Sequence, residues 1–141
     1  MDKPLLIFDG DCGFCRFWIE RWKSLTGDKV DYAPYQEVQT QFPSISKEAC
    51  EQAVQLVLPA GKIYSAAEAV FRTLAFAGRA RITLWLYQNF SGFRVLTEGF
   101  YSLVARHRVL FSRITRFIWG NHSEAPAYIF VREIFIFCLK N

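Results

Sequence analysis

The sequence predicts an α/β fold, a mixed β-sheet with helices on its faces in the order β-α-β-α-β-β-α, followed by a C-terminal helical extension. Two observations predict this architecture. Up to residue 78, short apolar segments bounded by turn residues alternate with segments of helical periodicity. From residue 79 onward the hydrophobic pattern is helical throughout. We therefore expect a single domain over 1–141, with a core at 4–78 and a helical extension at 79–141.

The first three predicted elements are a strand, a long helix and a second strand. The apolar run at 4–8 predicts the first strand. A helix over 12–25 is predicted by apolar side chains at helical spacing, namely Cys15, Trp18, Ile19, Trp22 and Leu25. Gly27 is expected to end this helix. Residues 29–35 predict the second strand, and Pro34 indicates that this strand ends there or lies at the edge of the sheet.

Residues 36–78 are expected to complete the core. Residues 36–46 are polar and predict a loop, after which Ser46 is expected to cap a short helix through residue 52. Apolar segments at 53–58 and 63–64, separated by a turn at 59–62, predict a β-hairpin. Ser65 and Glu68 have the spacing of a capping box and predict a helix to residue 77, closed by Gly78. This element order is that of the thioredoxin-like architecture.

The helical extension is predicted to contain helices near 80–90, 93–106 and 109–119, with breaks near Ser91-Gly92 and Gly120. The pattern of residues 128–139 fits a helix or a strand. Large aromatic side chains in such helices more often form a core than a contact surface. They are Trp85, Tyr87, Phe90, Phe93, Phe100, Tyr101, Phe111, Phe117 and Trp119. The apolar tail at 125–139 is expected to pack on the domain or in a dimer interface, and the oligomeric state is left open.

Composition narrows the cellular setting. The chain has 141 residues and is 52% hydrophobic, but its apolar runs are too short to cross a bilayer. No apolar segment of the length of a secretory signal precedes Asp9. Of the four cysteines, Cys50 and Cys138 are isolated, which suits a reducing compartment better than a disulfide-stapled secreted domain. We therefore expect a cytoplasmic location.

Charge is distributed unevenly along the chain. Residues 1–60 carry six Lys and Arg against nine Asp and Glu, whereas residues 61–141 carry eleven against four. A basic, aromatic-rich second half suits an acidic partner, nucleic acid or an anionic membrane surface, although solvated helix faces are the commoner explanation. We expect no nucleic-acid binding and keep peripheral membrane contact as an alternative.

The pair Cys12 and Cys15 carries the predicted chemistry. Residues three apart on a helix share a face with Cα atoms roughly 5 Å apart, within the range of a disulfide. At a helix N-terminus, unpaired N–H groups and the helix dipole favour the thiolate of Cys12 and lower its pKa. We expect Cys12 to be the exposed nucleophile and Cys15, on the apolar face, to be the sheltered resolving thiol.

Two carboxylates, Asp9 and Asp11, precede this pair and oppose thiolate formation. Asp11 is expected to be solvated or to cap helix N–H groups. Asp9, at the buried end of the first strand, has two interpretations of equal weight. It either carries a proton for Cys15 or forms a structural turn with Gly10.

The block from Phe8 to Cys15 resembles the signature of the DCC family of thiol-disulfide oxidoreductases, named for the pattern D-x-x-C-x-x-C that Asp9, Cys12 and Cys15 match. The hairpin and small-residue helix start at 61–69, and Tyr101 followed by Ala105-Arg106-His107-Arg108, also resemble that family. His107 departs from the expected asparagine, and no proline precedes the strand near residue 53, where thioredoxins place a cis-proline. The resemblance implies a thioredoxin-like fold, a redox role without metal or organic cofactor, and a protein or small-molecule thiol or disulfide as substrate.

Three other functions compete with this one. Asp9-Gly10-Asp11 also resembles the start of a haloacid-dehalogenase-type phosphatase site. Such sites hold magnesium with further carboxylates late in the chain, normally aspartates, and no aspartate follows Asp31. Zinc binding would have to recruit dispersed residues, which are Cys50, Cys138, His107 and His122. For these cysteines a buried hydrophobic role is the simpler interpretation, and His107 fits a basic helix face. A non-enzymatic adaptor would use the basic aromatic helices to bind a membrane surface or protein.

Overall fold

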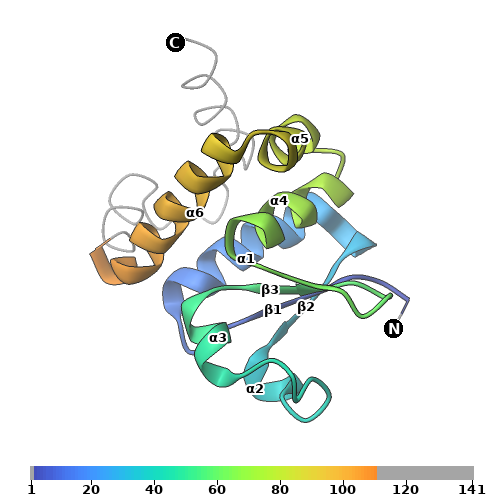
Figure 1. Ribbon diagram of the computed structural model, residues 1–141. Helices are drawn as coiled ribbons and strands as arrows, with labels where there is room; N and C mark the ends of the chain where they lie inside the picture. Colours follow the sequence, from blue (N-terminus) through green and yellow to red (C-terminus); the bar gives the residue numbers. More distant parts are fainter. Residues whose placement is uncertain (1, 111–141) are drawn as a thin grey trace.

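The computed structural model describes residues 2–110 and is built on a four-stranded mixed sheet in the order β2-β1-β3-β4 (Figure 1). Its central strand β1 runs parallel to β2 and antiparallel to β3, and β3 pairs with β4 as an antiparallel hairpin. The strands are β1 (Leu5–Phe8), β2 (Asp31–Pro34), β3 (Gln55–Val57) and β4 (Ile63–Ser65). The expected hairpin and mixed sheet are therefore confirmed.

Helices cover both faces of this sheet (Figure 1). On one face lie α1 (Gly13–Thr26), continued by the 3₁₀ turn η1 (Gly27–Lys29), and α4 (Ala66–Phe76). On the other lie α2 (Tyr35–Val38) and α3 (Lys47–Gln52). The helices α5 (Arg81–Asn89) and α6 (Ser91–Arg106) pack over α4 as a further layer. The chain thus has the predicted thioredoxin-like α/β fold, with a helical layer added to it.

The core is divided by the sheet into two apolar clusters. Alternate residues of a strand point to opposite faces, so Leu6 and Phe8 pack on the α1 and α4 side while Ile7 packs on the α2 and α3 side. The same alternation in β3 sends Leu56 to the first cluster and Val57 to the second. The central strands β1 and β3 are therefore buried on both faces, which explains the uninterrupted apolar sequence of β1.

Local signals place most element boundaries close to their predicted positions. Ser46 caps α3 by accepting a hydrogen bond from the Ala49 N–H at 3.1 Å. Gly27 ends α1 with φ at +56°, a conformation that glycine adopts without steric cost. Pro34 is the last residue of β2, which is an edge strand, so both expectations for this proline are confirmed.

Two local predictions are wrong. The predicted loop at 36–46 begins with a helical turn, α2, that follows directly on Pro34. Ser65 does not form a capping box, since its hydroxyl accepts from Gln55 Nε2 at 2.9 Å, while Glu68 forms an ion pair with Arg72. The predicted break near Ser91-Gly92 is confirmed, and it lies at Phe90, one residue before this pair.

The aromatic residues of α5 and α6 divide between core and surface. Tyr87 is buried and packs edge-on against Phe71, which also stacks with Phe93. In contrast, Trp85, Phe90 and Phe100 are each more than half exposed, so the expectation that they belong to a core is wrong for these three. Nearly all of the helix predicted at 109–119, the tail at 125–139, Cys138 and His122 lie outside the described residues.

A partly buried tyrosine attaches α6 to the sheet. The Tyr101 hydroxyl accepts a hydrogen bond from the backbone N–H of Val54 at 3.1 Å, just before β3. Burial raises the pKa of this hydroxyl, which therefore stays protonated at neutral pH. Within residues 2–110, no helix is both long enough and apolar enough to cross a lipid bilayer.

Removing the Tyr101 hydroxyl tests this attachment. Tyr101→Phe leaves the Val54 N–H without its partner, and we expect the free energy of unfolding to fall by about 1–3 kcal/mol. Urea denaturation followed by circular dichroism measures the change. Tyr64→Phe is the matched control, because the Tyr64 hydroxyl forms no hydrogen bond within residues 2–110, and should change stability by less than about 0.5 kcal/mol. Equal stabilities of the two variants would contradict the proposed anchoring role.

Candidate functional site: a dithiol at the start of α1

The two cysteines of the motif meet at the N-terminus of α1. Cys12 is the N-cap residue, with extended backbone dihedrals, and its Sγ accepts a hydrogen bond from the Cys15 N–H at 3.2 Å. The Cα atoms of Cys12 and Cys15 are 5.2 Å apart and their sulfurs are paired as a disulfide. The predicted helical geometry is confirmed, since a helix start places the thiols within bonding reach without distorting the backbone.

The surroundings of the two sulfurs differ less than the sequence predicts. Both cysteines are half-buried. Cys15 packs against the apolar cluster that contains Leu6 and Ile19, as its place on the apolar face of α1 requires. Cys12 lies outside that cluster and at the end of the loop from β1. Contact with the apolar core therefore distinguishes the two thiols more than their degree of exposure does.

Asp9 lies at the carboxyl end of β1, in the loop that leads to Cys12. The residue is only 8% exposed. Its Oδ1 accepts from the Asp11 N–H at 3.0 Å and from Gln36 Nε2 at 3.4 Å, and its Oδ2 forms an ion pair with Arg108 Nη1 at 3.4 Å. The Asp9 carbonyl also accepts from the Cys12 N–H at 3.3 Å. The structural turn expected for Asp9 is thus present, with Asp11 as its backbone donor.

Gln36, in α2 just after the end of β2, holds this loop and is absent from the predicted site. Its Oε1 accepts from the Gly10 N–H at 3.2 Å, and its Nε2 also donates to Asp11 Oδ2 at 3.1 Å. A Cβ at Gly10 would lie 2.7 Å from the Pro34 Cβ, so only glycine fits between the loop and β2. The position of Gln36 could have been predicted from the sequence, because the carboxyl ends of parallel strands meet at one edge of a sheet. Residues following β2 therefore belong beside those following β1.

Arg108 and Tyr101 also lie at this edge of the sheet, although the sequence indicates them only through the resemblance. Ninety-nine positions separate Asp9 from Arg108. No helical or strand periodicity relates residues so far apart, so pattern analysis of the chain alone does not bring them together. Asp11, expected to be solvated or to cap the helix, is exposed and bonds to Gln36 instead of capping α1.

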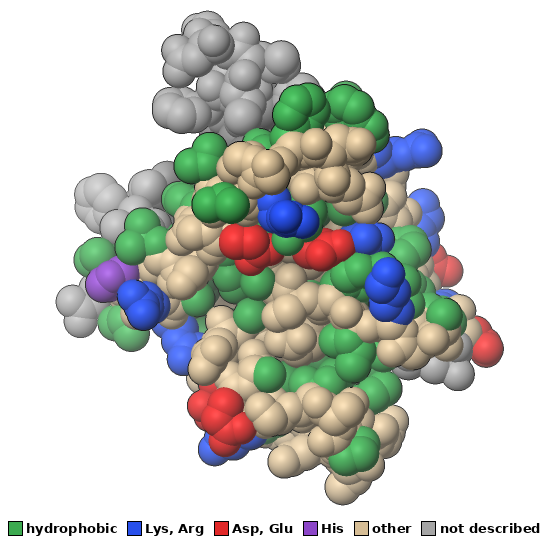
Figure 2. All heavy atoms as spheres, in the orientation of Figure 1, with side chains coloured by type: hydrophobic (Ala, Val, Ile, Leu, Met, Phe, Trp, Pro, Cys, Tyr) green, Lys and Arg blue, Asp and Glu red, His purple; other side chains and the backbone are tan. Residues whose placement is uncertain are grey.

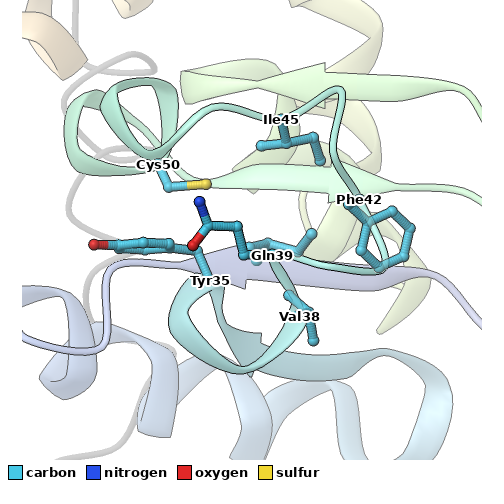
Figure 3. Close-up of a pocket in the computed structure, with 7 residues that line it drawn as sticks. Tyr35, Val38, Gln39, Phe42, Ile45 and Cys50 are labelled. Atoms are coloured by element: carbon cyan, nitrogen blue, oxygen red, sulfur yellow. The ribbon is translucent and has the colours of Figure 1, made fainter.

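Cys50 is a structural residue near the site. It is 3% exposed and points from α3 toward the side chains of Tyr35 and Gln39 (Figure 3). The adjoining cavity has a volume of about 10 Å³, the space of a single water molecule at most. Burial, reinforced by the negative charge of Asp9, raises the pKa of the Cys50 thiol to about 11. The thiol stays protonated at neutral pH, and the interpretation of Cys50 as a small buried hydrophobic residue is confirmed.

Of the two histidines considered as ligands, His122 lies outside the described residues. His107 is exposed at the C-terminal end of α6, in keeping with the predicted basic helix face. Within residues 2–110, no three His, Cys, Asp or Glu side chains are close enough together to hold a metal ion. Asp9 and Asp11 are instead bridged by the amide of Gln36.

Comparison with known proteins supports the dithiol as the defining feature. A family model described as DCC1-like thiol-disulfide oxidoreductase matches residues 6–114, which includes most of β1, the dithiol and all of α6. No curated protein and no solved structure matches the chain. Because the family match spans most of the sequence and includes the Cys12–Cys15 pair, the chain belongs to the DCC1-like thiol-disulfide oxidoreductase family.

Proposed function

We propose that this protein catalyses thiol-disulfide exchange through Cys12 and Cys15. The observation that carries the proposal is the position of Cys12 as N-cap of α1, paired with Cys15 one helical turn away. A thiolate at this position is stabilised by the N–H groups and dipole of the helix. Family membership supports the same reaction class.

In the proposed reaction, the Cys12 thiolate attacks one sulfur of a substrate disulfide and forms a mixed disulfide, while the other substrate sulfur leaves as a thiolate. Cys15 then loses its proton and attacks Cys12 Sγ. The Cys12–Cys15 disulfide forms and the second substrate thiolate leaves. Two electrons pass from the protein dithiol to the substrate, and the reverse sequence oxidises a substrate dithiol. The direction depends on the reduction potential of the pair.

Asp9 is the proposed acceptor of the Cys15 proton. It is the one acidic residue within 2–110 that is buried, and its backbone carbonyl is bonded to the N–H of Cys12. A carboxylate sheltered from solvent in the loop before a dithiol is a suitable group to receive a proton during the second attack. This role would be added to its observed function in the turn before α1.

The reactivity of Cys12 tests the proposed exchange. We expect oxidised and reduced protein to interconvert through a reversible Cys12–Cys15 disulfide, detected by mass spectrometry of alkylated peptides. Cys12→Ser should abolish reduction of a model disulfide such as oxidised glutathione, and Cys15→Ser should trap a mixed disulfide on Cys12. Cys50→Ser is the control and should keep wild-type rates. Failure of the disulfide to form, or unchanged activity in Cys12→Ser, would refute the proposed function.

Substitution of Asp9 tests proton transfer separately. Asp9→Asn keeps an oxygen acceptor for the Asp11 N–H but removes the basic carboxylate. Resolution of a preformed mixed disulfide on Cys12 should slow by roughly ten- to a hundredfold, as measured by stopped-flow mixing. Asp11→Asn, an exposed neighbour, is the control and should resolve at the wild-type rate. If Asp9→Asn resolves as fast as the control, Asp9 has only the turn role.

A second candidate function, docking on an anionic membrane surface, is favoured by the exposure of α5 and α6. Figure 2 shows hydrophobic side chains over this part of the molecule, with Lys and Arg side chains beside them. The large apolar side chains of α5 and α6 that are at least half exposed are Ile82, Trp85, Val95, Leu96, Phe100 and Leu103. Apolar groups flanked by arginines suit the boundary between lipid head groups and acyl chains.

This candidate is tested with Leu96→Glu, since Leu96 is 73% exposed and its replacement leaves the core intact. Co-sedimentation with vesicles rich in phosphatidylserine should weaken about tenfold or more, because burying a leucine is worth about 1.5–3 kcal/mol. Ser102→Glu adds the same charge to α6 without removing an apolar side chain and should have a smaller effect. Absence of vesicle binding by the wild-type protein would rule out this function and leave the redox proposal untouched.

A further inference from the structure

An ion pair connects the helical layer to the dithiol loop. Arg108 follows the C-terminal end of α6 and reaches Asp9, with Nη1 3.4 Å from Oδ2. The other ion pairs that we describe join residues three or four apart. The Asp9 side chain is only 11% exposed and that of Arg108 only 35% exposed. The pair is therefore better shielded from solvent than a typical surface salt bridge.

Tyr101 and Arg108 bring the C-terminal half of α6 to one edge of the sheet. Strands β1 and β3 are antiparallel, with Ile7 opposite Gln55, so the end of β1 lies beside the start of β3. Tyr101 binds the Val54 N–H at the start of β3, and Arg108, seven residues later, binds Asp9 just past the end of β1. Both contacts thus fall on the edge at which the loop to Cys12 leaves the sheet.

The charges around Cys12 explain why the position of Arg108 matters for the reactivity of this thiol. Asp9 and Asp11 lie in the loop before the thiol, and negative charges near a thiol disfavour the thiolate. Arg16 is one turn further along α1, and Arg108 comes from the end of α6. Gln36, which also contacts both carboxylates, is neutral. Of these groups, Arg108 is the cation in direct contact with Asp9.

We propose that Arg108 is a positioning residue of the dithiol site, which holds the Asp9 carboxylate against the loop and offsets its negative charge, so that the helical layer contributes to the nucleophilicity of Cys12. The inference rests on the proposed function and adds to it a residue outside the thioredoxin-like core. Arg108 acts through Asp9, since its described contact is with that carboxylate and not with either sulfur.

The test measures the rate at which iodoacetamide alkylates Cys12 in the reduced protein between pH 5 and 10, followed by mass spectrometry. Arg108→Gln leaves Asp9 uncompensated, which raises the pKa of the Cys12 thiol. The alkylation rate at pH 7 should therefore fall about three- to tenfold. Arg106→Gln is the matched control, since Arg106 is an exposed arginine of α6. It should leave the rate within about twofold of wild type.

A double-mutant cycle with Asp9→Asn identifies the route of the effect. If Arg108 acts through Asp9, Arg108→Gln should have little further effect in the Asp9→Asn background. Arg108→Lys keeps the charge but lacks the planar guanidinium, so it should restore most of the alkylation rate that Arg108→Gln loses. A fall in Arg108→Lys as large as that in Arg108→Gln would contradict the charge effect.

Two results would overturn the inference. One is a wild-type pH profile in Arg108→Gln, and the other is an equal fall in rate with and without the Asp9 carboxylate. The Cys12–Cys15 disulfide is followed in the same samples. A reversible disulfide together with an unaltered profile sinks only the role of Arg108, whereas failure of the wild-type disulfide to form sinks the proposed function.

Discussion

A buried carboxylate at the end of a central strand is the constraint on which the site depends. Asp9 is largely removed from water, and a carboxylate in that position must be matched by hydrogen-bond donors. Its donors come from three separate parts of the chain, which are the Asp11 N–H, the Gln36 amide and the Arg108 guanidinium. The contacts of this one carboxylate therefore connect the loop before α1, the residues just after β2 and the end of α6.

The loop that results is well suited to present Cys12. Gln36 binds the Gly10 N–H, and Gly10 fits closely against Pro34, so the chain between β1 and α1 is held at consecutive residues. The Asp9 carbonyl accepts the Cys12 N–H and leaves the sulfur of Cys12 to cap the helix. A thiol carried on such a supported turn keeps its position relative to the helix N-terminus, where the stabilisation of a thiolate is strongest.

Prediction from sequence succeeds here where a feature depends on neighbouring residues. The spacing of Cys12 and Cys15, the cap at Ser46 and the edge position of Pro34 follow from helical periodicity, cap preference and the missing proline N–H. It fails where a side chain has a choice of partners. Ser65 has the spacing of a helix cap, but its hydroxyl accepts from the buried amide of Gln55, which also donates to the Ala49 carbonyl.

The backbone N–H and carbonyl of Val54 are both hydrogen-bonded within the protein, and this limits how a substrate can bind at the start of β3. Val54, at the start of β3, donates its N–H to the Tyr101 hydroxyl, and its carbonyl accepts from the Ala66 N–H at 3.1 Å. An extended peptide adding itself at this position would first have to displace the side chain of Tyr101, because an N–H group donates one strong hydrogen bond at a time. Thioredoxins have a cis-proline before the corresponding strand, and this chain does not. In this chain, the backbone N–H just before β3 is instead bonded to the Tyr101 hydroxyl. The helical layer occupies that backbone donor and, through Arg108, also contacts the acid next to the dithiol loop.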